Sequence, residues 1–196
     1  SEPRIFRADA ERTFKDEELR QEMVQVLTTV ADGDYHQGLG YVSSFLMLTL
    51  PTPEVARVLH VLSTQEKYLQ GYWKAAPQAF GRDAMVFEEL LRRRDPEIAQ
   101  KLRGAGVVPE AYAQKWVCGL CVHVLPFKHL FTFFDRFTAR GAPYLFQFAL
   151  GLVQHTRTHL LSATAGDSSK LLSILRLDRV IFPDENDAFY EGLLQA

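Results

Sequence analysis

Helical periodicity constrains what this chain can fold into more than any other feature of its sequence. In one segment, apolar residues recur at the three- and four-residue spacing of a single helix face: Leu19, Met23, Val26, Leu27 and Val30. This predicts an amphipathic helix over about residues 15–31. No segment alternates between polar and apolar residues over a strand length, so the pattern predicts an all-α fold.

Breaker and cap residues divide the rest of the chain into further helices. Residues 39–50 are nearly all apolar and stop at Pro51, after which Thr52 is predicted to cap a helix with Pro53 in its first turn. Residues 68–76 are aromatic and less regular. Later helices are predicted around residues 87–95, 98–104 or 98–106, 109–126, 130–141, 145–162, 168–177 (capped by Asp167) and 183–194.

Length, composition and charge favour one globular domain over residues 1–196. The 196 residues are 47% hydrophobic and 23% charged, and no repeat of fixed period is found. A formal net charge of −2 argues against a nucleic-acid partner. No apolar run approaches the roughly 20 residues of a transmembrane helix. The polar start lacks a signal-peptide layout, and cysteine use is low, so a cytoplasmic location is expected.

Two other patterns bear on metal or redox chemistry. Cys118 and Cys121 form a C-x-x-C pair, which can be redox-active or metal-binding, but their apolar surroundings favour two buried helix cysteines. His155 and His159 are spaced to share one helix face and could hold a metal. No carboxylate in register accompanies them, so a solvated helix face is favoured and no metal site is predicted.

Two short motifs near the start carry the functional signal. The first is Asp9-Ala10-Glu11-Arg12-Thr13, and the second is Tyr35-His36-Gln37-Gly38-Leu39. Taken singly, they indicate a surface arginine paired with a carboxylate, and a glutamine at a helix start. Together they offer the two side-chain types that complete a GTPase active site, an arginine that neutralises phosphoryl charge and a glutamine that orients water.

The combination resembles the TBC domain, a family of GTPase-activating proteins for Rab-type small GTPases. Its arginine motif, I-x-x-D-x-x-R-T, is matched by residues 6–13 with Phe6 at the aliphatic position. Its glutamine motif, Y-x-Q-G-M, is matched by residues 35–39 with Leu39 at the methionine position. The likeness covers about residues 6–155, and further matches follow in the family's order: Leu90, Leu91, Pro96, Leu102, Gly106, Tyr112, Trp116, Pro126, Phe134, Asp135 and Gly141.

The chain resembles an N-terminally short version of that domain. The family has further helices ahead of the arginine motif, whereas this sequence begins almost at it. The family also has a longer loop after the arginine motif. Here Gln37 follows Arg12 by only 25 positions (37 minus 12). We expect the helices after residue 155 to belong to the same domain.

The resemblance implies a site with two catalytic side chains, Arg12 and Gln37, supplied to a partner. Asp9, Thr13, Tyr35 and Gly38 would support them: Asp9 by holding the arginine segment, Tyr35 by packing beneath it, and Gly38 by allowing close backbone approach. The partner would be a Rab-family GTPase in its GTP-bound state. It would carry the GTP and Mg²⁺ itself, so that no cofactor belongs to this chain, which has no phosphate-binding G-x-x-x-x-G-K-[ST] motif.

Two alternatives stay open at the level of sequence. One is a TBC-like module that binds Rab proteins or acts as a scaffold with weak or no GTPase-activating ability. The other is an unrelated helical scaffold or ligand-binding bundle that shares the pattern. In the leading interpretation the chain is an activator of its partner's hydrolysis rather than a hydrolase. It would act in membrane trafficking, at the cytosolic face of membranes that it could reach peripherally through the partner.

Overall fold

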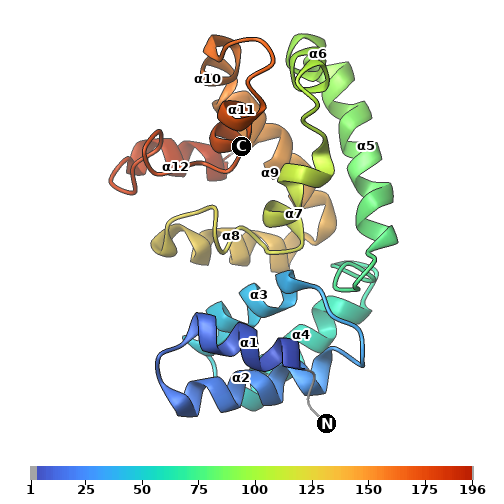
Figure 1. Ribbon diagram of the computed structural model, residues 1–196, viewed down its shortest axis with the longest axis vertical. Coiled ribbons are helices and arrows are strands. Elements are labelled where there is room, and N and C mark those ends of the chain that lie inside the picture. Colours follow the sequence, from blue (N-terminus) through green and yellow to red (C-terminus); the bar gives the residue numbers. More distant parts are fainter. Residues whose placement is uncertain (1–3, 196) are drawn as a thin grey trace. The chain divides into compact units, whose positions relative to one another are not determined.

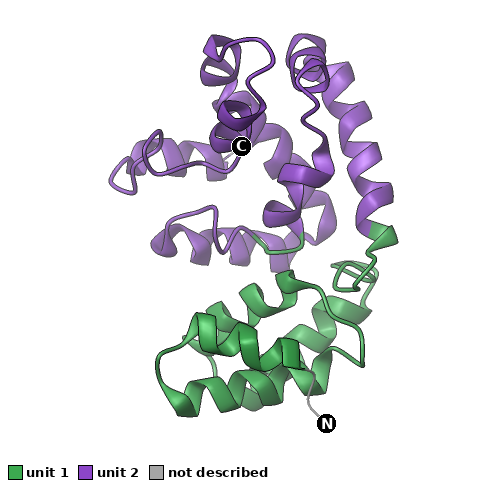
Figure 2. Cartoon of the chain, in the orientation of Figure 1, with its two compact units in different colours: residues 1–79, 118–120 green, residues 80–117, 121–196 purple. Residues whose placement is uncertain are grey.

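The computed structural model describes residues 4–195 as a succession of helices (Figure 1). Twelve helices and no strand occur among these residues, which confirms the predicted all-α class. They group into two compact units, coloured separately in Figure 2. The first unit comprises residues 4–79 and 118–120, and the second comprises residues 80–117 and 121–195. That residues 1–196 form one domain stays a prediction.

The first unit is built around α2, which packs against the other three helices. These helices are α1 (Arg4–Thr13), α2 (Glu17–Val30), α3 (Gln37–Met47) and α4 (Thr52–Thr64). Asp16 caps α2 by accepting a hydrogen bond from the backbone N–H of Leu19 at 3.0 Å. The core contains apolar side chains from all four helices: Phe6, Ala10, Met23, Val26, Leu27, Leu39, Val42, Phe45, Val55, Leu59 and Leu62.

In the second unit α9 packs against four other helices, α7, α8, α10 and α12. The elements are α5 (Gln78–Arg94), α6 (Pro96–Gly104), α7 (Pro109–Val117), α8 (Phe127–Arg140), α9 (Ala142–His155), α10 (Arg157–Ser162), α11 (Ser168–Leu175) and α12 (Asp187–Gln195). Polar contacts join α6 to α10. Lys101 donates to the carbonyls of Leu161 (2.8 Å) and Ala163 (2.5 Å), and Arg157 donates to Asp95 (2.7 Å).

The predicted cap of α4 is wrong. Pro51, in extended conformation, occupies the cap position without a side-chain hydrogen bond, and Thr52 is already the first helical residue. The Thr52 hydroxyl instead donates to Glu22 of α2 at 2.8 Å. The threonine therefore ties α4 to α2, because a tertiary carboxylate competes for the hydroxyl that local sequence would assign to the backbone.

The predicted helix over residues 109–126 is also wrong in its second half. α7 ends at Val117, and both Leu120 (φ 43°) and Cys121 (φ 59°) adopt left-handed backbone conformations. The backbone N–H of Cys121 donates to the carbonyl of Lys115 at 3.0 Å, which closes the turn. Cys118 and Cys121 are buried as expected, but neither lies in a helix. Apolar periodicity continues through this turn because its side chains are buried, so periodicity alone cannot detect the break.

The bounds of the helices predicted over residues 145–162, 168–177 and 183–194 differ from those observed. The segment over 145–162 is divided at Thr156, whose buried hydroxyl donates to the carbonyl of Leu152 at 2.9 Å, a contact typical of bent helices. α11 is capped by Asp167 as predicted, but it ends at Leu175. Pro183 opens a turn rather than a helix, and α12 begins four residues later, with Asn186 accepting from the N–H of Phe189 at 3.3 Å.

No helix among residues 4–195 is both long enough and apolar enough to cross a membrane.

Candidate functional site

Arg12 lies in the last turn of α1, on the side of the helix that faces away from the core. Phe6, Asp9 and Ala10 are the buried residues of this helix, whereas 65% of the Arg12 side chain is exposed. The end of α1 is well supported, because the hydroxyl of Thr13 donates to the carbonyl of Asp9 at 2.7 Å. The helix therefore presents the guanidinium outward from a fixed backbone.

A short connection leads from α1 into α2. The carbonyl of Phe14 accepts a hydrogen bond from Nε of Arg20 at 2.7 Å, and Asp16 caps the next helix. Both contacts restrain the three residues that follow the arginine motif. The connection is thus short and hydrogen-bonded.

The carboxylate of Asp9 joins the arginine motif to the glutamine motif. Its side chain is only 7% exposed. Oδ1 accepts a hydrogen bond from Nη2 of Arg12, and Oδ2 accepts one from the hydroxyl of Tyr35, which is 26 positions away in the sequence. A buried carboxylate is costly unless it is paired and hydrogen-bonded, and here a cation and a phenol meet that need together.

Tyr35 fills the space between α1 and α3. Its ring packs edge-on against Phe6, with ring centroids 5.1 Å apart and planes at 72°. The pKa of the Tyr35 phenol is raised above its ordinary value of 10.0, mainly by burial and secondly by the hydrogen bond to Asp9. The phenol therefore stays protonated at neutral pH and keeps donating to the carboxylate.

Gln37 is the first residue of α3 and is exposed. The preceding residue, His36, is extended, and its Nδ1 accepts a hydrogen bond from the N–H of Gly38 at 3.0 Å. The structure shows no hydrogen bond to the side-chain amide of Gln37 within residues 4–195. The amide is thus presented at a capped helix start, two residues after Tyr35.

Gly38 sits directly against the backbone of Cys118. A Cβ atom at this position would lie 2.5 Å from the carbonyl oxygen of Cys118 and 2.7 Å from its carbonyl carbon. That oxygen also accepts a hydrogen bond from the indole N–H of Trp73 at 2.7 Å. The close approach at Gly38 is therefore made to the chain's own backbone, and it seats the first turn of α3.

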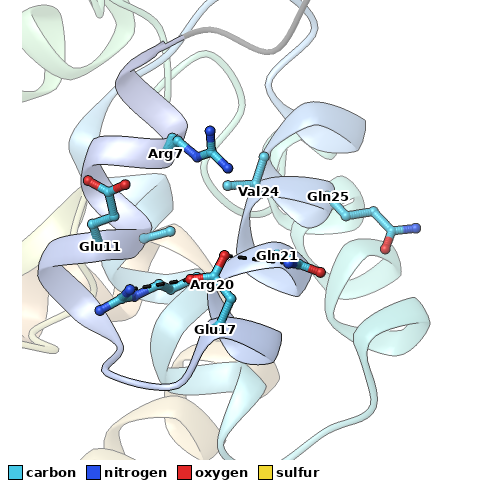
Figure 3. Close-up of a pocket in the computed structure, with 8 residues that line it drawn as sticks. Arg7, Glu11, Glu17, Arg20, Gln21, Val24 and Gln25 are labelled. Carbon is cyan, nitrogen blue, oxygen red and sulfur yellow. Dashed lines mark hydrogen bonds and ion pairs between the residues drawn. The ribbon is translucent and has the colours of Figure 1, made fainter.

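A groove of about 620 Å³ lies between α1 and α2 (Figure 3). Among its lining residues, Glu17 forms an ion pair with Arg20 at 3.3 Å and accepts a hydrogen bond from Gln21 at 3.4 Å. Neither Arg12 nor Gln37 lines this groove. Both side chains are instead exposed outside this groove, Arg12 at the end of α1 and Gln37 at the start of α3.

The structure thus connects four of the six sequence-predicted residues through hydrogen bonds: Asp9, Arg12, Thr13 and Tyr35. Gln37 and Gly38 follow on the segment that Tyr35 anchors. Nothing in the sequence indicated that the carbonyl of Cys118, held by Trp73, would contact the glutamine motif.

The structure also places the two histidines and two cysteines considered above for metal or redox chemistry. His155 belongs to α9 and His159 to α10, and their rings contact Phe189 and Phe182, respectively. No cluster of three histidine, cysteine or acidic side chains suited to a metal occurs in residues 4–195. Burial raises the pKa of the Cys118 thiol to about 12.

Comparison with known proteins gives one consistent family. The family model for the Rab-GTPase-TBC domain matches residues 2–161. Mouse Carabin is 33% identical over 139 residues, covering 69% of this chain and 31% of Carabin. Human TBC1 domain family member 10B is 30% identical over 125 residues, covering 64% of this chain and 15% of that protein. The chain therefore spans less than a third of the length of either relative.

The fold is similar to that of a solved structure as well. The crystal structure of the Chlamydomonas flagellar RabGAP TBC domain superimposes with a TM-score of 0.74, at 17% sequence identity, over 98% of this chain and 67% of that one. This likeness confirms the fold that the sequence resemblance implied. Because the family model covers most of the sequence, the chain belongs to the Rab-GTPase-TBC domain family.

Proposed function

We propose that this chain stimulates GTP hydrolysis by a Rab-type small GTPase, with Arg12 and Gln37 as the two side chains it supplies. The observation that carries the proposal is the Asp9 carboxylate, which binds the arginine of one motif and the tyrosine that precedes the glutamine of the other. A hydrogen bond of Asp9 thereby joins the two motifs, which are distant in the sequence. The partner provides GTP, Mg²⁺ and the phosphate-binding loop.

In this proposal Arg12 stabilises the charge that develops on the transferring phosphoryl group. Its guanidinium has five N–H donors, and the pairing with Asp9 leaves others for phosphate oxygens. An arginine supplied to a GTPase by a partner accelerates hydrolysis by about 10³–10⁵. The exposed position of Arg12 at the end of a helix suits insertion into the partner's nucleotide site.

Gln37 would orient the attacking water. Its amide can donate to one group and accept from another, which is what alignment of a water against the γ-phosphate requires. It is exposed and has no hydrogen bond within the described residues, so its amide is available to the partner. His36 and Gly38 hold the backbone beneath it.

The proposal is tested by single-turnover GTP hydrolysis across a panel of purified Rab proteins. Arg12→Ala and Gln37→Ala should each remove most of the stimulation, and Arg12→Lys should not restore it because a lysine lacks the planar fork. Arg7→Ala and Gln25→Ala remove exposed residues of the same types from α1 and α2 and serve as matched controls. Full stimulation by both Arg12→Ala and Gln37→Ala would refute the assignment.

A second measurement separates activation from mere binding. Affinity for the Rab protein loaded with GDP and aluminium fluoride reports on the transition-state complex, whereas affinity for the form loaded with a non-hydrolysable GTP analogue reports on the ground state. Arg12→Ala should weaken the first much more than the second. Binding that is equal in the two states, without stimulation, would instead support the scaffold alternative.

A further inference from the structure

Gly40 lies in the first turn of α3, directly beneath the link between the two motifs. It is buried, and a Cβ atom placed on it would lie 2.5 Å from the hydroxyl oxygen of Tyr35. The next nearest atoms are Oδ2 of Asp9 and Cε of Met23, each at 3.6 Å. The volume that any other side chain would enter is therefore the volume that the Tyr35 hydroxyl occupies.

The tyrosine can move only by losing contacts that it makes with α1. Its ring is held by the edge-on contact with Phe6, and its hydroxyl is committed to Oδ2 of Asp9. Contacts below 3.0 Å between a Cβ and another heavy atom essentially do not occur in proteins. A methyl group at position 40 would therefore push the phenol away from the carboxylate.

Displacement of the Tyr35 phenol would also affect Arg12, because Tyr35 fixes the orientation of the Asp9 carboxylate that binds Arg12. The terminal torsion of an aspartate is broad and has no strong intrinsic preference, so hydrogen bonds decide where its oxygens point. With Oδ2 held by Tyr35, Oδ1 is directed to Nη2 of Arg12. Without that anchor the carboxylate can rotate, and the exposed arginine loses its fixed partner.

We infer that Gly40 is a positioning residue for Arg12, because its missing side chain provides the space in which Tyr35 fixes the Asp9 carboxylate. Glycine in a helix interior is otherwise less favourable than alanine. The residue thus gives up helix stability to keep the link between the motifs. The effect on GTPase activation rests on the function proposed above, whereas the effect on the link does not.

A double-mutant cycle between Gly40→Ala and Tyr35→Phe tests the inference without any partner. In the parent chain, Gly40→Ala should lower the folding equilibrium constant at least tenfold. In the Tyr35→Phe background the hydroxyl is absent, and the same substitution should raise that constant through helix propensity. Equal effects of Gly40→Ala in the two backgrounds would overturn the inference. The double variant should fold even if the single one does not.

Nuclear magnetic resonance signals of the Arg12 guanidinium report on its pairing with Asp9, which a loss of packing elsewhere would not change. Tyr35→Phe and the Gly40→Ala, Tyr35→Phe double variant should shift the Arg12 side-chain signals in the same way, and folded Gly40→Ala should match them. Gly81→Ala, in a helix with open space around it, should leave them unchanged. Unaltered Arg12 signals in Gly40→Ala would contradict the inference.

Activity then separates the two proposals. If the parent chain stimulates a Rab protein, Gly40→Ala should lower the maximal stimulated rate at least tenfold and change the half-saturating concentration little. A full rate in Gly40→Ala would overturn the positioning role and leave the proposed function standing. If the parent stimulates no Rab protein, the proposed function fails, and the stability cycle and the Arg12 signals still decide on Gly40.

Discussion

Substitution of Gly38 by alanine probes the contact that seats the first turn of α3. The added Cβ would lie 2.5 Å from the carbonyl oxygen of Cys118, 2.7 Å from its carbonyl carbon and 3.1 Å from its Cβ. Two of the three atoms are backbone, so no flexible side chain can move aside. The oxygen is also held by the indole N–H of Trp73 at 2.7 Å. Either α3 or the segment at residue 118 must shift.

The expected loss follows from three contributions. Overpacking of a well-packed site costs about 1–3 kcal/mol. A shift that breaks the hydrogen bond from Trp73 leaves a buried indole N–H unsatisfied, at a cost of about 1–3 kcal/mol. Alanine is better than glycine within a helix by about 0.5–1 kcal/mol, which offsets a small part. We therefore expect Gly38→Ala to lower the free energy of unfolding by about 3 kcal/mol.

Urea denaturation followed by circular dichroism measures this change, with Gly81→Ala as the matched control. Gly81 is also helical, and no atom lies within 4 Å of its added Cβ. That variant should gain about 0.5–1 kcal/mol. Equal stability of the two alanine variants would refute the reasoning. In the Trp73→Phe background the carbonyl is no longer held, so the penalty of Gly38→Ala should shrink.

Three further predictions concern other parts of the chain. Burial raises the pKa of the Cys118 thiol to about 12 and also raises the pKa of the Cys121 thiol. Because the thiolate is the reactive form, Ellman's reagent at pH 8 should label neither cysteine until urea is added. Lys101→Met removes two hydrogen bonds to carbonyls near the end of α10, and should lower the melting temperature by several degrees in a thermal scan. Hydrogen bonds, chiefly from Lys128, lower the pKa of Asp187 below its ordinary value of 3.8. Its stabilising effect is thus complete above that value and is lost as the pH falls through the lowered pKa, so the melting-temperature deficit of Asp187→Asn should be present at pH 7 and vanish in acid.

Helices with a clear apolar face could be predicted from the sequence because burial of one stripe follows directly from residue spacing. The helix over residues 15–31 is observed as α2, and the one that ends at Gly141 is observed as α8. The breaks at Cys121 and Thr156 could not be predicted in this way. Both positions are buried, so their neighbours remain apolar while a left-handed backbone or a back-bonded hydroxyl interrupts the helix.

For the candidate site, the sequence by itself determined which residues to consider and which family they resemble. Arg12 and Gln37 stand out because their motifs recur in the order of the TBC domain, and the family match bears out that resemblance. The sequence also predicted a helix after each motif, but it did not predict α1, the helix that contains the arginine motif. It carried no information on which side chains would touch between them.

Only the tertiary structure decided how the motifs are joined. The Asp9 carboxylate meets the Tyr35 hydroxyl across 26 positions because α1 and α3 bury their apolar faces in one core with α2. The space for that contact exists because position 40 is a glycine, and Gly38 is seated by a carbonyl 80 positions later in the chain (118 minus 38). Local periodicity describes one helix at a time, whereas these contacts depend on packing between segments that are distant in the sequence.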